Sequence, residues 1–125
     1  MDHQQIFPTN LFIQDDFLAP QRLPALKNEI LSLYEKRKPN WQTGPDLDKT
    51  EPFKWFAKDI SKEVFKSIDA MDYIADTIEI TSMWGNVLKP GETHQPHSHS
   101  NNFLSGVFYI AVSYTHLRAH ETSID

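Results

Sequence analysis

Apolar residues recur at helical spacing in two stretches of the chain. The first starts at Leu23, places apolar side chains at three- and four-residue steps, and ends at Pro39. The second follows Thr50, which can cap a helix, and Pro52, which suits a first turn because its missing N–H has no partner there. Its apolar stripe predicts core packing and comprises Phe53, Phe56, Ile60, Val64, Ile68 and Met71.

The period of the pattern changes to two beyond the second helix. Residues 77–81 (TIEIT) alternate apolar and polar side chains, residues 89–92 (KPGE) indicate a turn, and residues 103–112 form another β-like run. Residues 6–12, which contain Pro8, suit an edge strand. Helices gathered ahead of a mostly antiparallel sheet predict an α+β fold, with residues 39–49 as a loop between the helices.

Composition allows one small domain with a core and excludes several function classes. The 125 residues are 39% hydrophobic, with a formal net charge of −5 and no cysteine. The 12 basic residues are scattered, which argues against nucleic acid, and the absence of cysteine excludes disulfides and thiolate metal sites. Neither a signal peptide nor an apolar run of about 18 residues is present, so we expect a cytoplasmic protein without a membrane partner.

The end of the chain is unlike the rest. Residues 112–122 (VSYTHLRAHET) resemble the translation of a sequencing adapter over eleven consecutive positions. We therefore interpret residues 1–111 as the N-terminal part of a single domain, and residues 112–125 as a non-native tail. His116 and His120 have the spacing of two zinc ligands on one helix face, but as part of that tail they are discounted.

Candidate chemistry is concentrated in a short histidine-rich stretch. His94, His97 and His99 are three of the six histidines in the chain. Side chains two apart on an extended segment point to the same side, so His97 and His99 can face one metal ion, whereas His94 stands at an odd spacing beyond Pro96. Imidazole suits Fe(II), Zn, Cu and Ni. A polar loop whose histidines contact only water is the alternative.

The motifs of this region resemble those of the 2-oxoglutarate- and Fe(II)-dependent oxygenases, specifically a bacterial and phage branch. The resemblance covers most of residues 6–111, and its specific part lies near the end of that range. The matching residues are Phe7-Pro8-Thr9, Trp84-Gly85-Asn86, Gly91, His97-Ser98-His99 and Leu104-Ser105-Gly106-Val107-Phe108-Tyr109.

This resemblance implies a truncated double-stranded β-helix (jelly-roll or cupin-like) behind the N-terminal helices. It also implies a hydroxylase-type dioxygenase acting on a small-molecule or peptide substrate, with Fe(II) and 2-oxoglutarate as cofactors. His97 and His99 would bind the metal, and Asn86 and Tyr109 could bind 2-oxoglutarate. The remaining histidine ligand and a basic residue for 2-oxoglutarate would follow on later strands, so we expect this fragment to be inactive.

One position departs from the family's pattern. The usual motif is His-x-Asp or His-x-Glu, whereas this chain has His99 there and no acidic residue between Thr93 and His120. His97 is therefore the stronger metal candidate of the pair.

Two alternatives stay open. A cupin would share the spacing from Gly91 to the His-x-His, although Phe103 and Leu104 stand where its glutamate is expected. A non-enzymatic binding module, with incidental histidines, belongs to a different class. Consumption of 2-oxoglutarate would distinguish the oxygenase from the cupin, and metal titration would distinguish it from the module.

Overall fold

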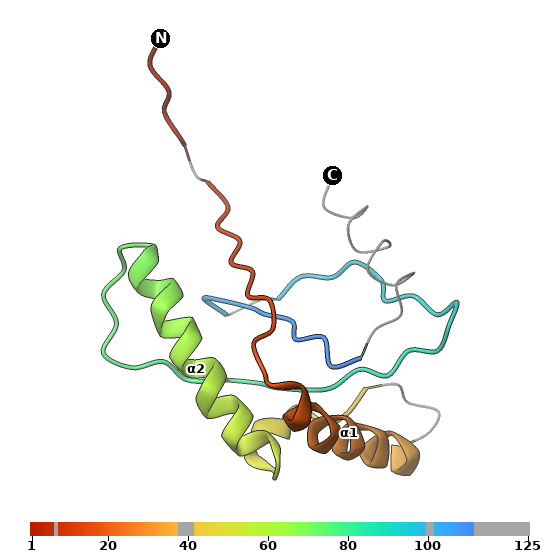
Figure 1. Ribbon diagram of the computed structural model, residues 1–125. Helices are drawn as coiled ribbons and strands as arrows, with labels where there is room; N and C mark the ends of the chain where they lie inside the picture. Colours follow the sequence, from red (N-terminus) through yellow and green to blue (C-terminus); the bar gives the residue numbers. More distant parts are fainter. Residues whose placement is uncertain (7, 38–41, 100–101, 112–125) are drawn as a thin grey trace.

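The computed structural model describes residues 1–6, 8–37, 42–99 and 102–111, and its helices all lie before residue 71 (Figure 1). A 3-10 turn, η1 (Pro20–Arg22), leads directly into helix α1 (Leu23–Arg37). A second 3-10 turn, η2 (Leu47–Lys49), precedes helix α2 (Phe53–Ala70). Both predicted helices are thus confirmed. None of the described helices is long and apolar enough to cross a membrane.

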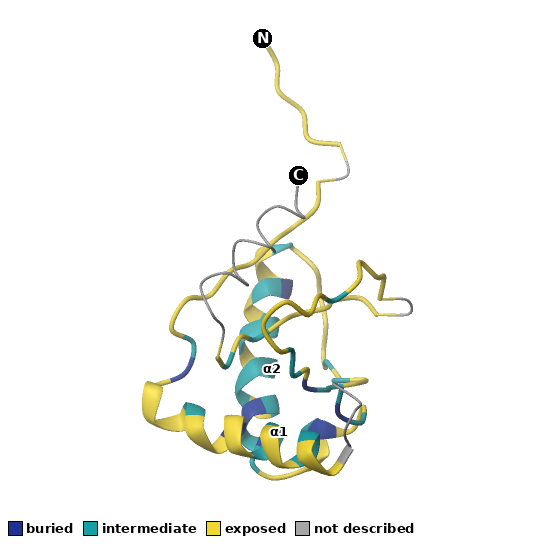
Figure 2. Cartoon of the chain, turned by 90° about the vertical axis from the view of Figure 1, so that its right-hand side faces the viewer, coloured by how far each residue is buried: buried dark blue, intermediate teal, exposed yellow. Residues whose placement is uncertain are grey.

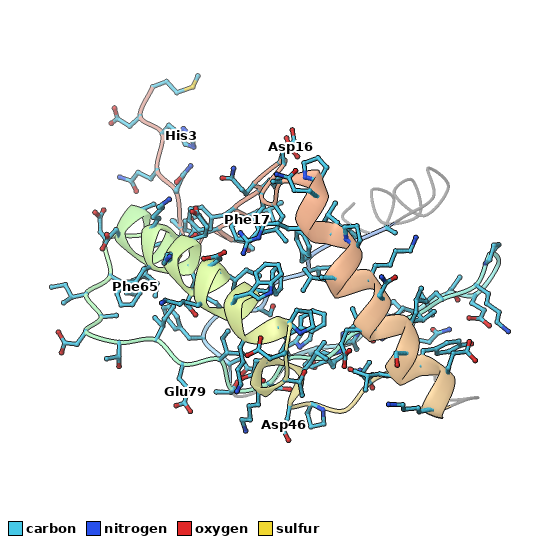
Figure 3. All side chains as sticks on the ribbon, turned by 60° about the horizontal axis from the view of Figure 1, so that its bottom comes forward. His3, Asp16, Phe17, Asp46, Phe65 and Glu79 are labelled. Atoms are coloured by element: carbon cyan, nitrogen blue, oxygen red, sulfur yellow. The ribbon has the colours of Figure 1, made fainter. Side chains whose placement is uncertain are left out.

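The core lies where the two helices meet the segments on either side of them. Phe17, just before η1, contacts Phe56 of α2 edge-on, with ring centroids 6.2 Å apart (Figure 3). Phe108 packs on Phe56 at 4.9 Å, so the chain returns to α2 after the wide loop seen in Figure 1. Figure 2 shows the N-terminal segment exposed, in contrast to α2. The buried cluster comprises Leu18, Leu26, Leu47, Phe53 and Phe56.

The start of α2 differs from the prediction. Thr50 does not cap this helix: its hydroxyl donates to the carbonyl of Leu47 at 2.8 Å, and Pro52 is the residue that precedes the first helical turn. Because the hydroxyl donates to a residue of the preceding 3-10 turn, η2, it is directed away from the N–H groups of α2. The apolar stripe is confirmed, with Phe53, Phe56 and Ile68 buried.

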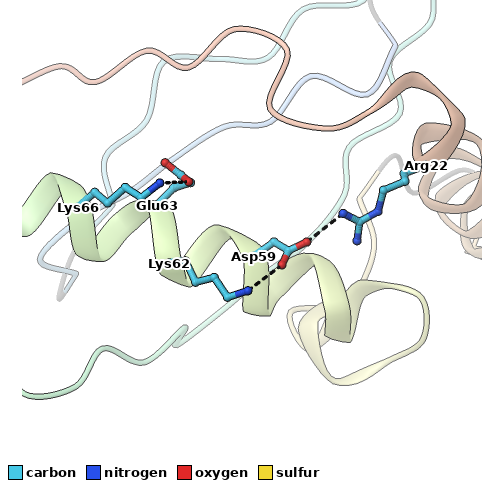
Figure 4. Close-up of polar contacts among 5 residues, drawn as sticks. All are labelled: Arg22, Asp59, Lys62, Glu63 and Lys66. Atoms are coloured by element: carbon cyan, nitrogen blue, oxygen red, sulfur yellow. Dashed lines mark hydrogen bonds and ion pairs between the residues drawn. The ribbon is translucent and has the colours of Figure 1, made fainter.

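A polar face of α2 carries the ion pairs drawn in Figure 4. The guanidinium of Arg22 donates to Asp59 at 3.1 Å and lies 3.9 Å from the centre of the Trp55 ring. Lys62 also reaches Asp59, and Lys66 pairs with Glu63 at 2.7 Å. Because these groups are partly or largely exposed, each pair stabilises the fold only slightly. The pair of Arg22 with Asp59 connects η1 to the side of α2, whereas the other two pairs lie within α2.

The predicted α+β fold with a truncated double-stranded β-helix is wrong for the described residues. They contain helices and extended chain but no β-strand, and their only bridges are the isolated pairs Gln42–Asn86 and Asp46–Met83. The edge strand predicted at residues 6–12 is likewise absent from the part described. Phe7, residues 38–41 and residues 112–125 lie outside the described ranges, so the adapter interpretation stays a prediction.

The period-two pattern nevertheless has a structural counterpart. Ile78 and Ile80 are half-buried, whereas Glu79 between them is exposed and points away from the helices (Figure 3). Alternating burial requires only an extended backbone, because successive side chains then point to opposite sides. A strand also requires a neighbouring chain that continues the hydrogen-bonded ladder. The alternating pattern is typical of both features, and the described residues have only the first.

A clasp of four hydrogen bonds joins residues 43–47 to residues 83–85. The amide of Thr43 donates to the carbonyl of Gly85 at 2.9 Å, and the amide of Gly85 donates to Thr43 Oγ1 at 2.8 Å. The amide of Leu47 donates to the carbonyl of Met83 at 3.0 Å, and the amide of Met83 donates to the carbonyl of Pro45 at 2.8 Å. This clasp attaches the extended C-terminal chain to the loop between the helices.

The predicted turn at residues 89–92 is confirmed. Gly91 has a φ of 87°, which favours glycine, and follows Pro90 as expected for a type II turn. The amide of Glu92 donates to the carbonyl of Lys89 at 3.0 Å, and the amide of Lys89 donates to the Glu92 carboxylate at 2.9 Å. The turn redirects the chain into the histidine-rich stretch.

We expect Gly85→Ala to destabilise the protein by about 1–3 kcal/mol, because an added methyl group overpacks a filled site. A Cβ at Gly85 would lie 2.9 Å from Ile30 Cδ1, 3.0 Å from Cγ1 and 3.3 Å from Cγ2. Urea unfolding followed by circular dichroism measures the loss. Gly106→Ala is the matched control, since a Cβ there meets nothing within 4 Å. Ile30→Val should recover part of the loss in the double variant; equal stabilities of the two alanine variants would contradict the close packing.

We expect Thr43→Val to destabilise the protein by about 1–3 kcal/mol, because it leaves the buried amide of Gly85 without its acceptor. Thr43→Ser keeps the oxygen and should lose much less. Thr77→Val applies the same chemical change at an exposed position. Thermal unfolding ranks the three variants. A Val variant at position 43 as stable as the Ser variant would show that the hydroxyl does not hold the clasp.

Candidate metal centre

Three imidazole rings follow one another along the stretch after the turn. The ring centroids of His94 and His97 lie 4.4 Å apart with planes inclined by 30°, and those of His97 and His99 lie 4.8 Å apart with planes inclined by 63°. His94 is half-buried, whereas His97 and His99 are exposed. The stretch from His94 to His99 has no helical structure. Residue spacing predicted that His94 would lie apart from the other two histidines. Its ring nevertheless lies as close to the ring of His97 as the ring of His99 does.

The angle between the ring planes differs between the pair His94–His97 and the pair His97–His99, and this angle affects how each pair could bind a metal ion. A metal bond lies in the plane of the imidazole ring, so the stacked rings of His94 and His97 present faces to each other rather than converging lone pairs. The rings of His97 and His99 meet edge to face and are not stacked. Two imidazoles on one ion, with metal–nitrogen bonds of about 2.1 Å, have ring centres roughly 4.6–5.3 Å apart. The 4.8 Å separation of His97 and His99 fits that range.

His97 has a further feature that metal-binding histidines share. Its Nδ1 lies 3.0 Å from the carbonyl oxygen of Gln95. A carbonyl only accepts, so this contact is a hydrogen bond when Nδ1 carries the proton, and the lone pair of the neutral ring then resides on Nε2. Such a bond sets the ring's orientation in many metal sites. If His97 binds a metal ion in this tautomer, Nε2 is the atom that is available to it.

His99 lies against an aromatic ring. Its imidazole stacks on Trp84, with centroids 5.8 Å apart and planes inclined by 24°. Trp84 itself is half-buried. Thr81 donates to Asn102 Oδ1 at 2.8 Å, and the pairs 81–102 and 84–99 share one antiparallel register. A two-residue turn at residues 89–92 would place residue 84 opposite residue 97, so the turn alone does not predict the contact between Trp84 and His99.

The two residues predicted to bind 2-oxoglutarate lie on different parts of the extended chain. Asn86 is exposed, two residues beyond Trp84, and its backbone forms the isolated bridge with Gln42. Tyr109 is 43% exposed and follows Phe108, which packs on α2. Their cofactor-binding roles stay predictions.

A third metal ligand is not found among the described residues, where no group of three His, Cys, Asp or Glu side chains could hold a metal ion. His116 and His120 fall outside those ranges. Two imidazoles suit ferrous iron as donors, and the metal-binding roles of His97 and His99 stay predictions.

Comparison with known proteins supports the family resemblance. A family model described as "Putative 2OG-Fe(II) oxygenase" matches residues 82–124. This confirms the resemblance of the chain to the 2-oxoglutarate- and Fe(II)-dependent oxygenase superfamily, over a stretch that includes Trp84, both candidate ligands and part of the C-terminal tail. At the level of the family, the match supports an oxygenase that uses Fe(II) and 2-oxoglutarate. No curated protein and no solved structure matches the chain.

Proposed function

We propose that this chain supplies two metal ligands, His97 and His99, of a hydroxylase-type dioxygenase that depends on Fe(II) and 2-oxoglutarate. The observation that carries the proposal is the pair of inclined imidazoles, 4.8 Å apart, within the stretch that the oxygenase family model matches. When bound, iron and 2-oxoglutarate together supply the oxidising chemistry that activates oxygen. The chain's own residues hold and orient these groups, and the substrate is a small molecule or a peptide.

The residues have separate roles in this proposal. His97 binds through Nε2, with its other nitrogen held by the carbonyl of Gln95. His99 is the second ligand. Asn86 and Tyr109 bind 2-oxoglutarate, because an amide and a phenol can both donate hydrogen bonds to its carboxylates. The remaining ligand and the basic partner of 2-oxoglutarate come from outside residues 1–111, so we expect these 125 residues alone to be inactive.

We expect His97→Ala to weaken Co(II) binding at least tenfold, because losing one of two imidazoles removes a metal bond that a single remaining ring cannot replace. His99→Ala should weaken it less. Anaerobic calorimetric titration measures both, and the same titration with Fe(II) tests the native metal. His3→Ala removes an exposed histidine of the N-terminal segment and serves as the matched control. Unchanged affinity in the His97 variant would instead favour a non-enzymatic module.

We expect 2-oxoglutarate to bind only after the metal, since it would attach to the open positions that two histidines leave. Calorimetry with and without Co(II) measures this dependence. Asn86→Ala should weaken 2-oxoglutarate binding about tenfold, the loss expected for an unmade hydrogen bond to a charged group, without changing Co(II) affinity. Metal binding without any binding of 2-oxoglutarate would favour a cupin. Succinate formation by the 125-residue chain would refute its proposed inactivity.

A further inference from the structure

Trp84 lies in the extended C-terminal chain between two residues that belong to the clasp. Its two sequence neighbours, Met83 and Gly85, each donate and accept one hydrogen bond in the clasp with residues 43–47. Gly85 also lies directly beneath Ile30 of helix α1. The backbone on both sides of Trp84 is therefore fixed to the helical part of the molecule.

Two histidines of the histidine-rich stretch lie at its exposed end. His97 and His99 are exposed, and the hydrogen bond from His97 runs only to Gln95 within the same stretch. The stacking of His99 on Trp84, at 5.8 Å and 24°, connects this stretch to a residue that the clasp holds. A flat indole face restricts rotation of an imidazole that lies parallel to it, which an aliphatic side chain does less well.

We propose that Trp84 is a positioning residue for His99. The clasp fixes the backbone on both sides of Trp84, and stacking on Trp84 then restricts the imidazole of His99 to an orientation suited to metal binding. This inference rests on the proposed function, because it concerns the same two ligands. Trp84 itself touches neither the metal nor the substrate. Its effect is to reduce the freedom that His99 must lose on binding, and preorganisation of this kind raises affinity.

A residue that merely fills space would behave differently. Its truncation would lower the stability of the fold, and any effect on metal binding would not depend on which histidine is present. A positioning residue acts through His99 alone. The two cases are therefore separated by the coupling between position 84 and each of the two histidines.

The test is Co(II) titration of Trp84→Leu and Trp84→Phe in the full chain. We expect Trp84→Leu to weaken Co(II) binding about threefold to tenfold, the scale of one aromatic stacking contact, and Trp84→Phe to weaken it less. In the His99→Ala background the Leu substitution should have no further effect, whereas in the His97→Ala background it should still weaken binding. Trp55→Leu on helix α2 is the matched control and should leave Co(II) affinity unchanged.

A second measurement keeps the inference testable if Trp84→Leu folds poorly. The difference in emission between the native chain and Trp84→Phe isolates the fluorescence of Trp84, and bound Co(II) should quench it. Unquenched Trp84 emission at saturating Co(II) would overturn the inference. So would native affinity in a folded Trp84→Leu variant, while loss of binding in His97→Ala would leave the proposed function standing. Absence of Co(II) binding by the native chain would overturn both.

Discussion

The hydrogen-bonded clasp between residues 43–47 and 83–85 is the interaction on which the candidate site depends. Beyond α2 the described chain forms no ladder that could hold it in place, so its position relies on a few localised contacts. The clasp supplies hydrogen-bond partners to the backbone amides of the buried residues Thr43, Leu47 and Gly85, where a missing partner would be most unfavourable. Thr43 contributes both its amide and its hydroxyl, and it is the buried polar residue of the described core.

Side-chain contacts, rather than backbone pairing, connect the clasp to the histidines. Trp84 stacks on His99, His99 lies beside His97, and His97 stacks on His94. Phe108 provides a second attachment by returning the chain to Phe56 of α2. The histidines thus occupy an exposed loop between two anchored points. This is the arrangement expected when a scaffold presents binding residues on a connecting segment.

The helices were predictable because their evidence is local. Leu26 and the stripe on α2 follow from residue spacing alone, and burial of Leu26, Phe53 and Phe56 agrees with it. The turn at residues 89–92 was predictable for the same reason, since Pro90 and Gly91 impose their backbone angles. The prediction of a sheet was wrong for the described residues, because an alternating pattern does not show whether a distant partner pairs with the segment. The clasp was not predictable, since it joins residues about forty positions apart, and one side chain, that of Thr43, takes part in it.

The error in the fold class does not remove the basis of the metal hypothesis. That hypothesis required an extended segment with His97 and His99 on a common side, and a helix or rings splayed apart would have ended it. The described stretch is not helical, and the two rings lie 4.8 Å apart. What changes is the source of preorganisation. In a sheet, neighbouring strands would hold the ligands, whereas here the orientation of His99 depends on the face of one indole and that of His97 on one carbonyl.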